Sequence, residues 1–105
     1  MNRALGSLGL AMRAGRVQSG TDACDKLIRA GSAHLILIDA GASPATQKAV
    51  TDACADYNVL YRLVPAGELG QAIGKSGRMV AAITDRAFAE RLAALLEDAA
   101  KQSID

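Results

Sequence analysis

The sequence predicts an α/β fold: a three-layer α/β/α sandwich with a four-stranded mixed sheet and about five helices. Helical and strand patterns alternate along the 105 residues without a linker or a repeat, as in sheets that are covered by helices. Residues 33–39 and 79–84 are apolar without alternation, which is typical of strands buried on both faces. Half of the residues are hydrophobic, enough for one core, so we expect a single domain over residues 1–105.

The N-terminal segment predicts a helix from residue 2 to about Gly15, because apolar residues recur at helical spacing and glycine commonly follows a helix end. The residues expected on its core-facing stripe are Leu5, Leu8, Gly9 and Met12. Glycines at positions 6 and 9 each cost such a helix about 1 kcal/mol relative to alanine. We therefore expect close packing to require them.

Residues 16–20 predict a short strand that leads into a second helix, which Thr21 caps and Gly31 ends. The inner stripe of that helix is expected to be Cys24, Leu27 and Ile28. His34 opens the buried strand 33–39 without an acidic or serine partner, and we expect a satisfied structural histidine and not a catalytic one.

Ser43 and Pro44 predict the start of a third helix, since serine is a good N-cap and proline suits the first helical position. Its expected inner stripe is Ala49, Val50, Ala53, Cys54 and Tyr57. A strand at 59–64, a short helix at 67–74 and a strand at 79–84 follow. The stripe of the final helix begins with Phe88, Leu92, Leu95 and Leu96.

Composition excludes several classes of protein. The longest apolar run, residues 34–40, is too short to span a bilayer, and arginines directly follow the apolar part of the N-terminal segment. We expect a cytoplasmic protein with no membrane partner. Two cysteines, one histidine and no CxxC pair exclude a zinc site of the usual ligands, and no cofactor is expected.

Charge is distributed unevenly along a chain of net charge +1. Residues 1–29 carry five basic and two acidic side chains, and residues 61–78 carry three and one. The other two segments each have an excess of acidic side chains. The basic segments also hold the glycine-rich turns, which favours a local basic face; mixed solvated charge is the alternative. Three aromatic residues are too few for a base-stacking platform.

Residues 74–78, Gly-Lys-Ser-Gly-Arg, raise the question of phosphate binding. They are not a P-loop, because the position five residues before Gly74 is Leu69 and a helix precedes the loop where a P-loop has a strand. They also feed a strand, unlike the loop between two helices of a KH domain. What remains is glycines that allow close approach, with Lys75 and Arg78 to meet phosphate. An ordinary charged turn is the alternative.

The junction at Gly20 is a second candidate. A helix N-terminus there offers free N–H groups to an anion. Asp22, Lys26 and Arg29 follow on the outer face of the helix. A solvated Asp–Lys pair is the alternative interpretation.

Longer patterns resemble a known family. They are Gly20 with Lys26 six residues on, the strand 33–39 before Ser43-Pro44, Tyr-Asn-Val-Leu-Tyr-Arg-Leu-Val at 57–64, and Glu-Leu-Gly-Gln-Ala-Ile-Gly-Lys at 68–75 leading into a strand. In this order and spacing, residues 3–92 resemble the ribosomal L7Ae/L30e family of kink-turn RNA binders, and within it the small bacterial YlxQ-like branch.

The resemblance implies an α/β/α sandwich, no catalysis, and a bent, structured RNA, ribosomal or messenger, as the partner. Ribosomal or translation proteins are further candidate partners, and a monomer is expected. Carried over, the RNA-binding residues are Gly20, Thr21, Asp22, Ala23, Lys26, Gly74, Lys75, Ser76, Gly77 and Arg78. Arg16 and Arg62 are candidates to flank this site.

One departure from the family concerns specificity. Family members carry Asn-Glu where this chain has Asp22-Ala23. Asp accepts hydrogen bonds but does not donate them as Asn does, and Ala does neither. The alternative function is therefore a protein-interaction module that has lost kink-turn specificity, with residues 92–101 as a partner surface.

An enzyme or receiver-like domain is a third hypothesis. Asp39 ends a strand as a phosphoacceptor does, but the accompanying carboxylates and lysine are missing from the expected strand ends. Cys24 lies near a helix N-terminus, which lowers a thiol pKa, yet its place on the inner stripe predicts burial. We find no catalytic constellation in the sequence.

Overall fold

The computed structural model describes the backbone of residues 2–104 and the side chains of residues 3–96. Within this range five helices alternate with four strands, which confirms the predicted fold class. The elements are α1 (Asn2–Arg13), β1 (Val17–Ser19), α2 (Thr21–Arg29), β2 (Leu35–Asp39), α3 (Pro44–Asp56), β3 (Tyr61–Val64), α4 (Glu68–Ile73), β4 (Val80–Ile83) and α5 (Arg86–Ile104). None of the helices described is both long and apolar enough to cross a membrane.

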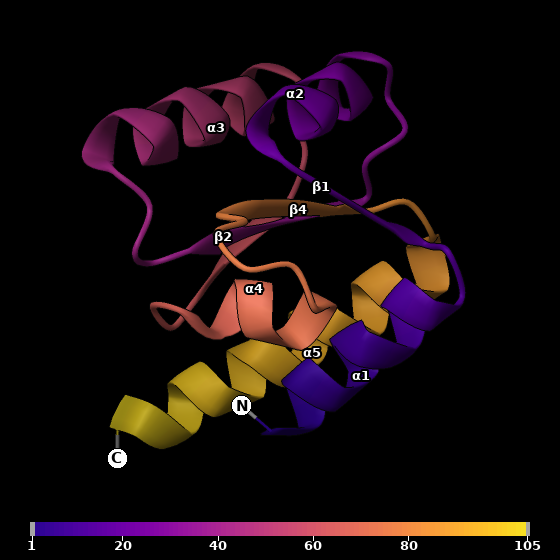
Figure 1. Ribbon diagram of the computed structural model, residues 1–105, viewed down its shortest axis with the longest axis vertical. Coiled ribbons are helices and arrows are strands. Elements are labelled where there is room, and N and C mark those ends of the chain that lie inside the picture. The colour runs from indigo at the N-terminus through magenta and orange to yellow at the C-terminus, as the bar shows by residue number, and fades with distance from the viewer. Residues whose placement is uncertain (1, 105) are drawn as a thin grey trace.

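The sheet is mixed and has the strand order β1-β4-β2-β3. β2 pairs with β3 in parallel, whereas β4 pairs with β1 and with β2 in the antiparallel sense. α2 and α3 cover one face, and α1, α4 and α5 cover the other (Figure 1). The central strands β2 and β4 are therefore buried on both faces throughout their lengths, as their apolar sequences predict.

Each face of the sheet has its own hydrophobic core. One lies beneath α2 and α3 and contains Cys24, Ile28, Ile36, Ile38, Val50, Ala53, Cys54, Val80 and Ala82, among others. The other lies beneath α1, α4 and α5 and contains Leu8, Leu35, Leu37, Leu69, Ile73, Ile83 and Leu92, among others. The alternation within β2 and β4 thus divides adjacent side chains between the two cores.

The predicted stripe of α1 is rotated in the structure. Its buried residues are Ala4, Ser7, Leu8 and Ala11, and Met12 packs at the edge of the core. A methyl group added at Gly6 or Gly9 would meet no heavy atom within 4 Å. Close packing therefore does not explain these glycines, and that prediction is wrong.

Predictions for the helix starts are partly confirmed. Ser43 caps α3 by accepting a 3.1 Å hydrogen bond from the Thr46 N–H, with Pro44 in the first turn. In α2 the N-cap is Gly20 and Thr21 is the first helical residue. The extended, positive-φ backbone at Gly20 both ends β1 and begins α2, so no side chain caps this helix.

Two positions of the predicted inner stripe of α3 are exposed. Ala49 and Tyr57 face solvent, with 44% of Tyr57 accessible. His34 is exposed as well, and its backbone N–H donates to Ile83 at 2.9 Å. The side chain of His34 therefore faces solvent, and its backbone takes part in the sheet.

Candidate functional site

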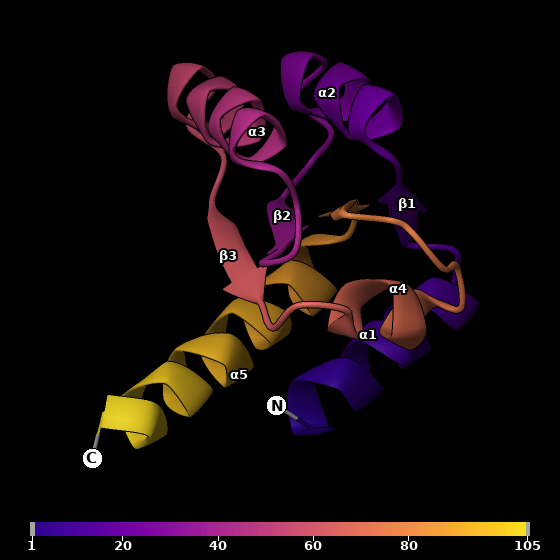
Figure 2. The ribbon, with the colours of Figure 1, turned by 60° about the vertical axis from the view of Figure 1, so that its left-hand side comes forward.

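The antiparallel pairing of β1 with β4 brings together two loops that are more than fifty residues apart in the sequence. The last residue of β1, Ser19, pairs with Ala81 near the start of β4. The next N–H, that of Gly20, donates to the Val80 carbonyl at 3.0 Å. The β1–α2 junction (residues 19–23) thus lies beside the α4–β4 loop (residues 74–79), as Figure 2 shows.

The closest contact between the two loops joins Gly20 and Arg78. Arg78 Nη1 donates to the Ser19 carbonyl at 3.4 Å, which places the guanidinium over the Cα atom of Gly20. A Cβ atom built on Gly20 would lie 2.5 Å from Arg78 Nη1, and the residue has a φ of 103°. The backbone conformation therefore favours glycine here, and an added Cβ atom would displace the Arg78 side chain.

A cleft of about 350 Å³ opens where the loops meet. Its lining residues are Gly20, Thr21, Thr46, Ser76, Gly77, Arg78 and Met79. The first intrahelical bond of α2 runs from the Cys24 N–H to the Gly20 carbonyl at 3.0 Å. The N–H groups of residues 21–23 therefore have no partner within the helix, and the positive end of the helix dipole lies at the cleft.

The α4–β4 loop has a defined conformation. Gly74 ends α4 with a φ of 71°, and Gly77 has a φ of 82°. Between them the Lys75 N–H donates to the Gly70 carbonyl at 2.9 Å, and the Arg78 N–H donates to the Lys75 carbonyl at 3.3 Å. These two bonds close a turn that leaves the side chains of Lys75 and Arg78 exposed.

Gly70 contributes to this loop although the sequence-based prediction did not include it. A Cβ atom at Gly70 would lie 2.8 Å from the Lys75 carbonyl oxygen and 3.5 Å from the Gly77 nitrogen. The loop backbone therefore packs directly on the helix, where only glycine leaves room. The signal in the sequence was a glycine inside a short helix, where it lowers helix stability and so indicates a packing reason.

Positive charge at the site comes from Lys26, Lys75 and Arg78, all exposed. Among side chains 3–96, the ion pairs are Arg29–Asp25 and Lys48–Asp52, so none of the three site cations is in an ion pair within that range. Lys26 lies five residues after Thr21 in α2, which corresponds to a rise of about 8 Å along the helix. Asp22, in the first turn of α2, is exposed and adds one negative charge.

The structure does not bring the two proposed flanking arginines to the cleft. Arg16 lies at the opposite end of β1, where its carbonyl accepts a 2.9 Å bond from the Thr84 N–H. Arg62 lies on β3, at the far edge of the sheet from β1, and its Nη1 donates to the Tyr61 carbonyl at 2.9 Å.

A second cleft, with a volume of about 590 Å³, is also lined by residues of the α4–β4 loop. Glycines 67, 70, 74 and 77 line it, together with Gln71 and Arg78, and Asp39 lies against it. The Asp39 side chain is 1% exposed and accepts three backbone N–H bonds, from Gly41, Gly67 and Leu69. It is a structural carboxylate in this fold and not an open phosphoacceptor.

The two thiols are unsuited to nucleophilic chemistry. Cys24 and Cys54 are buried in the core beneath α2 and α3. The pKa of Cys24 is raised to about 12, mainly by burial and to a smaller extent by the nearby Cys54, while Arg78 partly offsets the rise. Burial also raises the pKa of Cys54 to about 11. Within the described side chains, no group of three or more His, Cys, Asp or Glu residues is placed to hold a metal ion.

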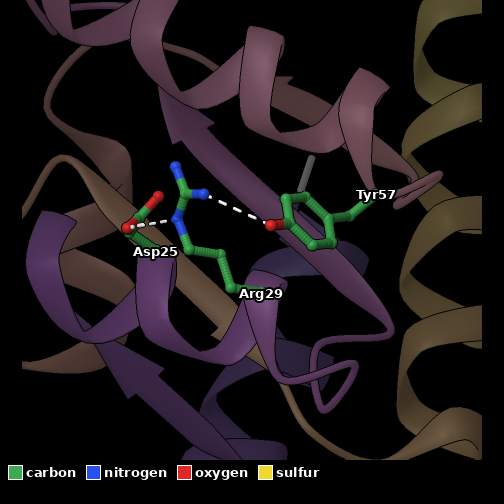
Figure 3. Close-up of polar contacts among 3 residues, drawn as sticks. All are labelled: Asp25, Arg29 and Tyr57. Atoms are coloured by element: carbon green, nitrogen blue, oxygen red, sulfur yellow. Dashed lines mark hydrogen bonds and ion pairs between the residues drawn. The ribbon is translucent and has the colours of Figure 1, made fainter.

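A polar cluster of Asp25, Arg29 and Tyr57 ties α2 to the end of α3 (Figure 3). Arg29 Nε pairs with Asp25 Oδ2 at 2.9 Å, and Arg29 Nη1 donates to the Tyr57 hydroxyl at 3.3 Å. The guanidinium also lies 5.5 Å from the centre of the Tyr57 ring. The outer-face cation Arg29 is thus engaged within the protein, whereas Lys26 is not in an ion pair with any described side chain.

Comparison with known proteins gives a family match over most of the chain. The model of the ribosomal protein L7Ae/L30e/S12e/Gadd45 family matches residues 2–93. The chain is 47% identical over 91 residues to the RNA-binding protein YlxQ of Bacillus subtilis, which covers 86% of this chain and 91% of that protein. It is 35% identical over 96 residues to the RNA-binding protein YlxQ of Enterococcus faecium, and the match covers 90% of this chain and 92% of that protein.

Solved structures agree on the fold. A protein with unknown function from Bacillus halodurans superposes with a TM-score of 0.86 at 34% identity, covering 90% of this chain and 96% of that one. The 15.5kD RNA binding protein of Giardia lamblia superposes with a TM-score of 0.75 at 22% identity, and the match covers 90% of this chain and 84% of that one. The second likeness, at this identity, is evidence of a shared fold only.

Proposed function

Because the chain belongs to the ribosomal protein L7Ae/L30e/S12e/Gadd45 family, we propose that it is a small, non-enzymatic RNA-binding protein of the cytoplasm. Its ligand is a structured, sharply bent RNA of the kink-turn type, in a ribosomal or translation-associated setting. The observation that carries the proposal is the contact between Gly20 and Arg78, which joins the two candidate RNA loops into one surface. The names of the YlxQ relatives support RNA as the ligand.

The mechanism is the neutralisation of backbone phosphates at a bend. The free N–H groups of residues 21–23 bind one phosphate at the positive end of α2. Lys26, Lys75 and Arg78 meet neighbouring phosphates, and Gly77, whose Cβ position has no heavy atom within 4 Å, lets the RNA backbone approach the protein backbone. About four phosphate contacts predict that log K falls with log salt at a slope of roughly −3 to −4.

A set of charge-matched variants tests this surface. Lys75→Gln and Arg78→Gln each remove one positive charge at the loops, and Arg91→Gln removes one from the exposed face of α5 on the opposite layer. We expect each loop variant to weaken binding to a kink-turn RNA and to reduce the salt slope by about 1. Arg91→Gln should leave both unchanged. If all three variants lose affinity equally, general charge and not this surface binds the RNA.

Specificity is the second part of the proposal. Ala23 has no side-chain group for a base edge and Asp22 offers only acceptors. One good base contact is worth about 1–3 kcal/mol of discrimination, so this chain should distinguish sheared G·A pairs less well than relatives that carry Asn-Glu. The test is the ratio of the affinity for an intact kink-turn to the affinity for the same RNA with its G·A pairs replaced. In the double variant Asp22→Asn/Ala23→Glu this ratio should be at least about fivefold larger than in the wild type. An unchanged ratio would refute this explanation.

A protein-interaction module on the same fold is the second candidate function. The described part of the surface first expected, from Leu92 to Leu96, is largely used in the core, and the side chains of residues 97–101 lie outside those described. Exposed large apolar side chains instead follow the edge strand β3: Leu60, Tyr61 and Leu63 are 40–52% accessible. If purified protein binds no structured RNA but Leu63→Ser removes it from a stable complex in cell extract, this function replaces the first.

A further inference from the structure

We propose that Asp39 is a positioning residue for the RNA surface: it fixes both ends of the α4–β4 loop and so sets where Lys75 and Arg78 stand. This inference rests on the proposed function, because it concerns the surface that function uses. Asp39 itself is 1% exposed and is not expected to touch RNA.

The side chain of Asp39 fixes the start of α4, and through it the entry to the loop. Oδ1 accepts from the Gly67 N–H at 3.0 Å, and Oδ2 accepts from the Leu69 N–H at 3.2 Å. These donors lie in the first turn of α4, where backbone N–H groups lack helical partners. A carboxylate there also interacts favourably with the helix dipole. Because α4 has only six residues, holding its first turn also fixes Gly74 at its end.

The backbone of Asp39 fixes the exit from the loop. Its N–H donates to the Met79 carbonyl at 2.8 Å, one residue after Arg78. Met79 also lines the cleft where the two loops meet. The same residue thus ties the last position of the loop to the end of β2, while its side chain ties the helix before the loop to the same point.

A third contact links Asp39 to the start of α3. The Gly41 N–H donates to Oδ1 at 2.7 Å, and a Cβ atom on Gly41 would lie 3.0 Å from that oxygen. The turn 40–43 then leads to α3, whose Thr46 lines the cleft. Charge-assisted bonds of this kind are stronger than bonds between neutral groups. The carboxylate of Asp39 therefore holds the start of α4 and the turn before α3, and its backbone N–H holds the end of the α4–β4 loop.

The variant Asp39→Asn tests the proposal. Its side-chain amide keeps one acceptor oxygen but places an NH₂ group against an N–H donor, so at least one of the three bonds is lost. Asp85→Asn is the matched control, because Asp85 Oδ2 likewise accepts from a first-turn N–H, that of Phe88 at 2.9 Å, but at α5 beyond the other end of β4. Both variants are compared under conditions where circular dichroism shows them fully folded.

Two readouts follow. Amide hydrogen exchange of Lys75, whose N–H bonds to Gly70 within the loop, should become about tenfold faster in Asp39→Asn and stay unchanged in Asp85→Asn. The affinity for a kink-turn RNA should fall about tenfold in Asp39→Asn and stay within about twofold in Asp85→Asn. If Asp39→Asn behaves like the control in the exchange experiment, the loop does not depend on Asp39 and the proposal is overturned.

The RNA-affinity measurement distinguishes a failure of this proposal from a failure of the function on which it rests. If the wild type binds no structured RNA, the proposed function fails, and the exchange of Lys75 still decides whether Asp39 positions the loop. If the wild type binds and exchange accelerates while affinity holds, the loop position does not matter for RNA and the proposal is overturned.

Discussion

Replacing Gly20 with alanine tests the geometry on which the joined surface depends. Gly20 has a φ of 103° and a ψ of 143°, in a region of backbone space that is essentially restricted to glycine. A residue with a Cβ atom held there costs about 1–3 kcal/mol. The new Cβ would also meet Arg78 Nη1 at 2.5 Å, but that atom ends a flexible side chain that can move away at little cost.

We therefore expect Gly20→Ala to lower the free energy of unfolding by about 1–3 kcal/mol, mostly through backbone strain. For a domain of this size that corresponds to a fall in Tm of roughly 5–15 °C. Urea titration followed by circular dichroism measures the loss. Arg78 is displaced in the same variant, so the affinity for a kink-turn RNA should fall as well.

Two comparisons make the experiment decisive. Gly6→Ala is the matched substitution in α1, where an added Cβ meets nothing within 4 Å, and it should raise stability by up to about 1 kcal/mol. The double variant Gly20→Ala/Arg78→Ala should recover little of the loss, because strain and not the clash dominates. If Gly20→Ala is as stable as the wild type, the junction does not depend on the left-handed backbone and the reasoning is refuted.

Three further outcomes are expected. Gly70→Ala should cost about 1–3 kcal/mol and weaken RNA binding, because its Cβ would lie 2.8 Å from the Lys75 carbonyl and the loop backbone must shift. The thiols of Cys24 and Cys54, with pKa values raised from 9.0 to about 12 and about 11, should react with a thiol reagent only on unfolding. Their contribution to stability is complete below about pH 9 and is lost as pH rises toward 12, since only the unfolded thiols ionise in that window. Arg29→Ala should change the urea midpoint of unfolding little, because the contacts of Arg29 are solvent-exposed.

Each of these outcomes has a comparison. For Gly70→Ala it is Gly9→Ala, which lacks a neighbour within 4 Å and should not lower affinity. For the thiols it is the double variant Cys24→Ala/Cys54→Ala, whose stability should fall less steeply between pH 9 and 11; equal slopes would contradict the buried-thiol explanation. For Arg29, a fall in the urea midpoint as large as that of Gly70→Ala would contradict the expectation that these exposed contacts between α2 and α3 contribute little.

The elements of the fold follow from local patterns, and the sequence predicts them well. Ser43-Pro44 and Gly31 mark helix ends through backbone chemistry that acts within a few residues. The rotation of α1 and the exposure of Tyr57 were not predictable in the same way. Both depend on where a helix sits relative to the sheet, which periodicity alone does not contain.

The site likewise divides into features that local sequence predicts and features that depend on long-range packing. The two loops are indicated in the sequence by their glycines, their lysines and a helix start, and the family resemblance implies which residues bind RNA. That the loops touch follows only from the antiparallel pairing of β1 with β4, a long-range fact. Thr46 and Asp39 reach the loops from other elements, so no local pattern could include them, and strand order separates Arg62 from the site.

The central claim is that the two joined loops form an RNA-binding surface. The most direct measurement is the affinity of the purified wild-type protein for a kink-turn RNA and for the same RNA with its G·A pairs replaced, each at two salt concentrations. We predict binding of both, tighter for the intact kink-turn, with a salt slope of roughly −3 to −4. Absence of binding to either RNA, or an affinity that does not change with salt, would contradict the account.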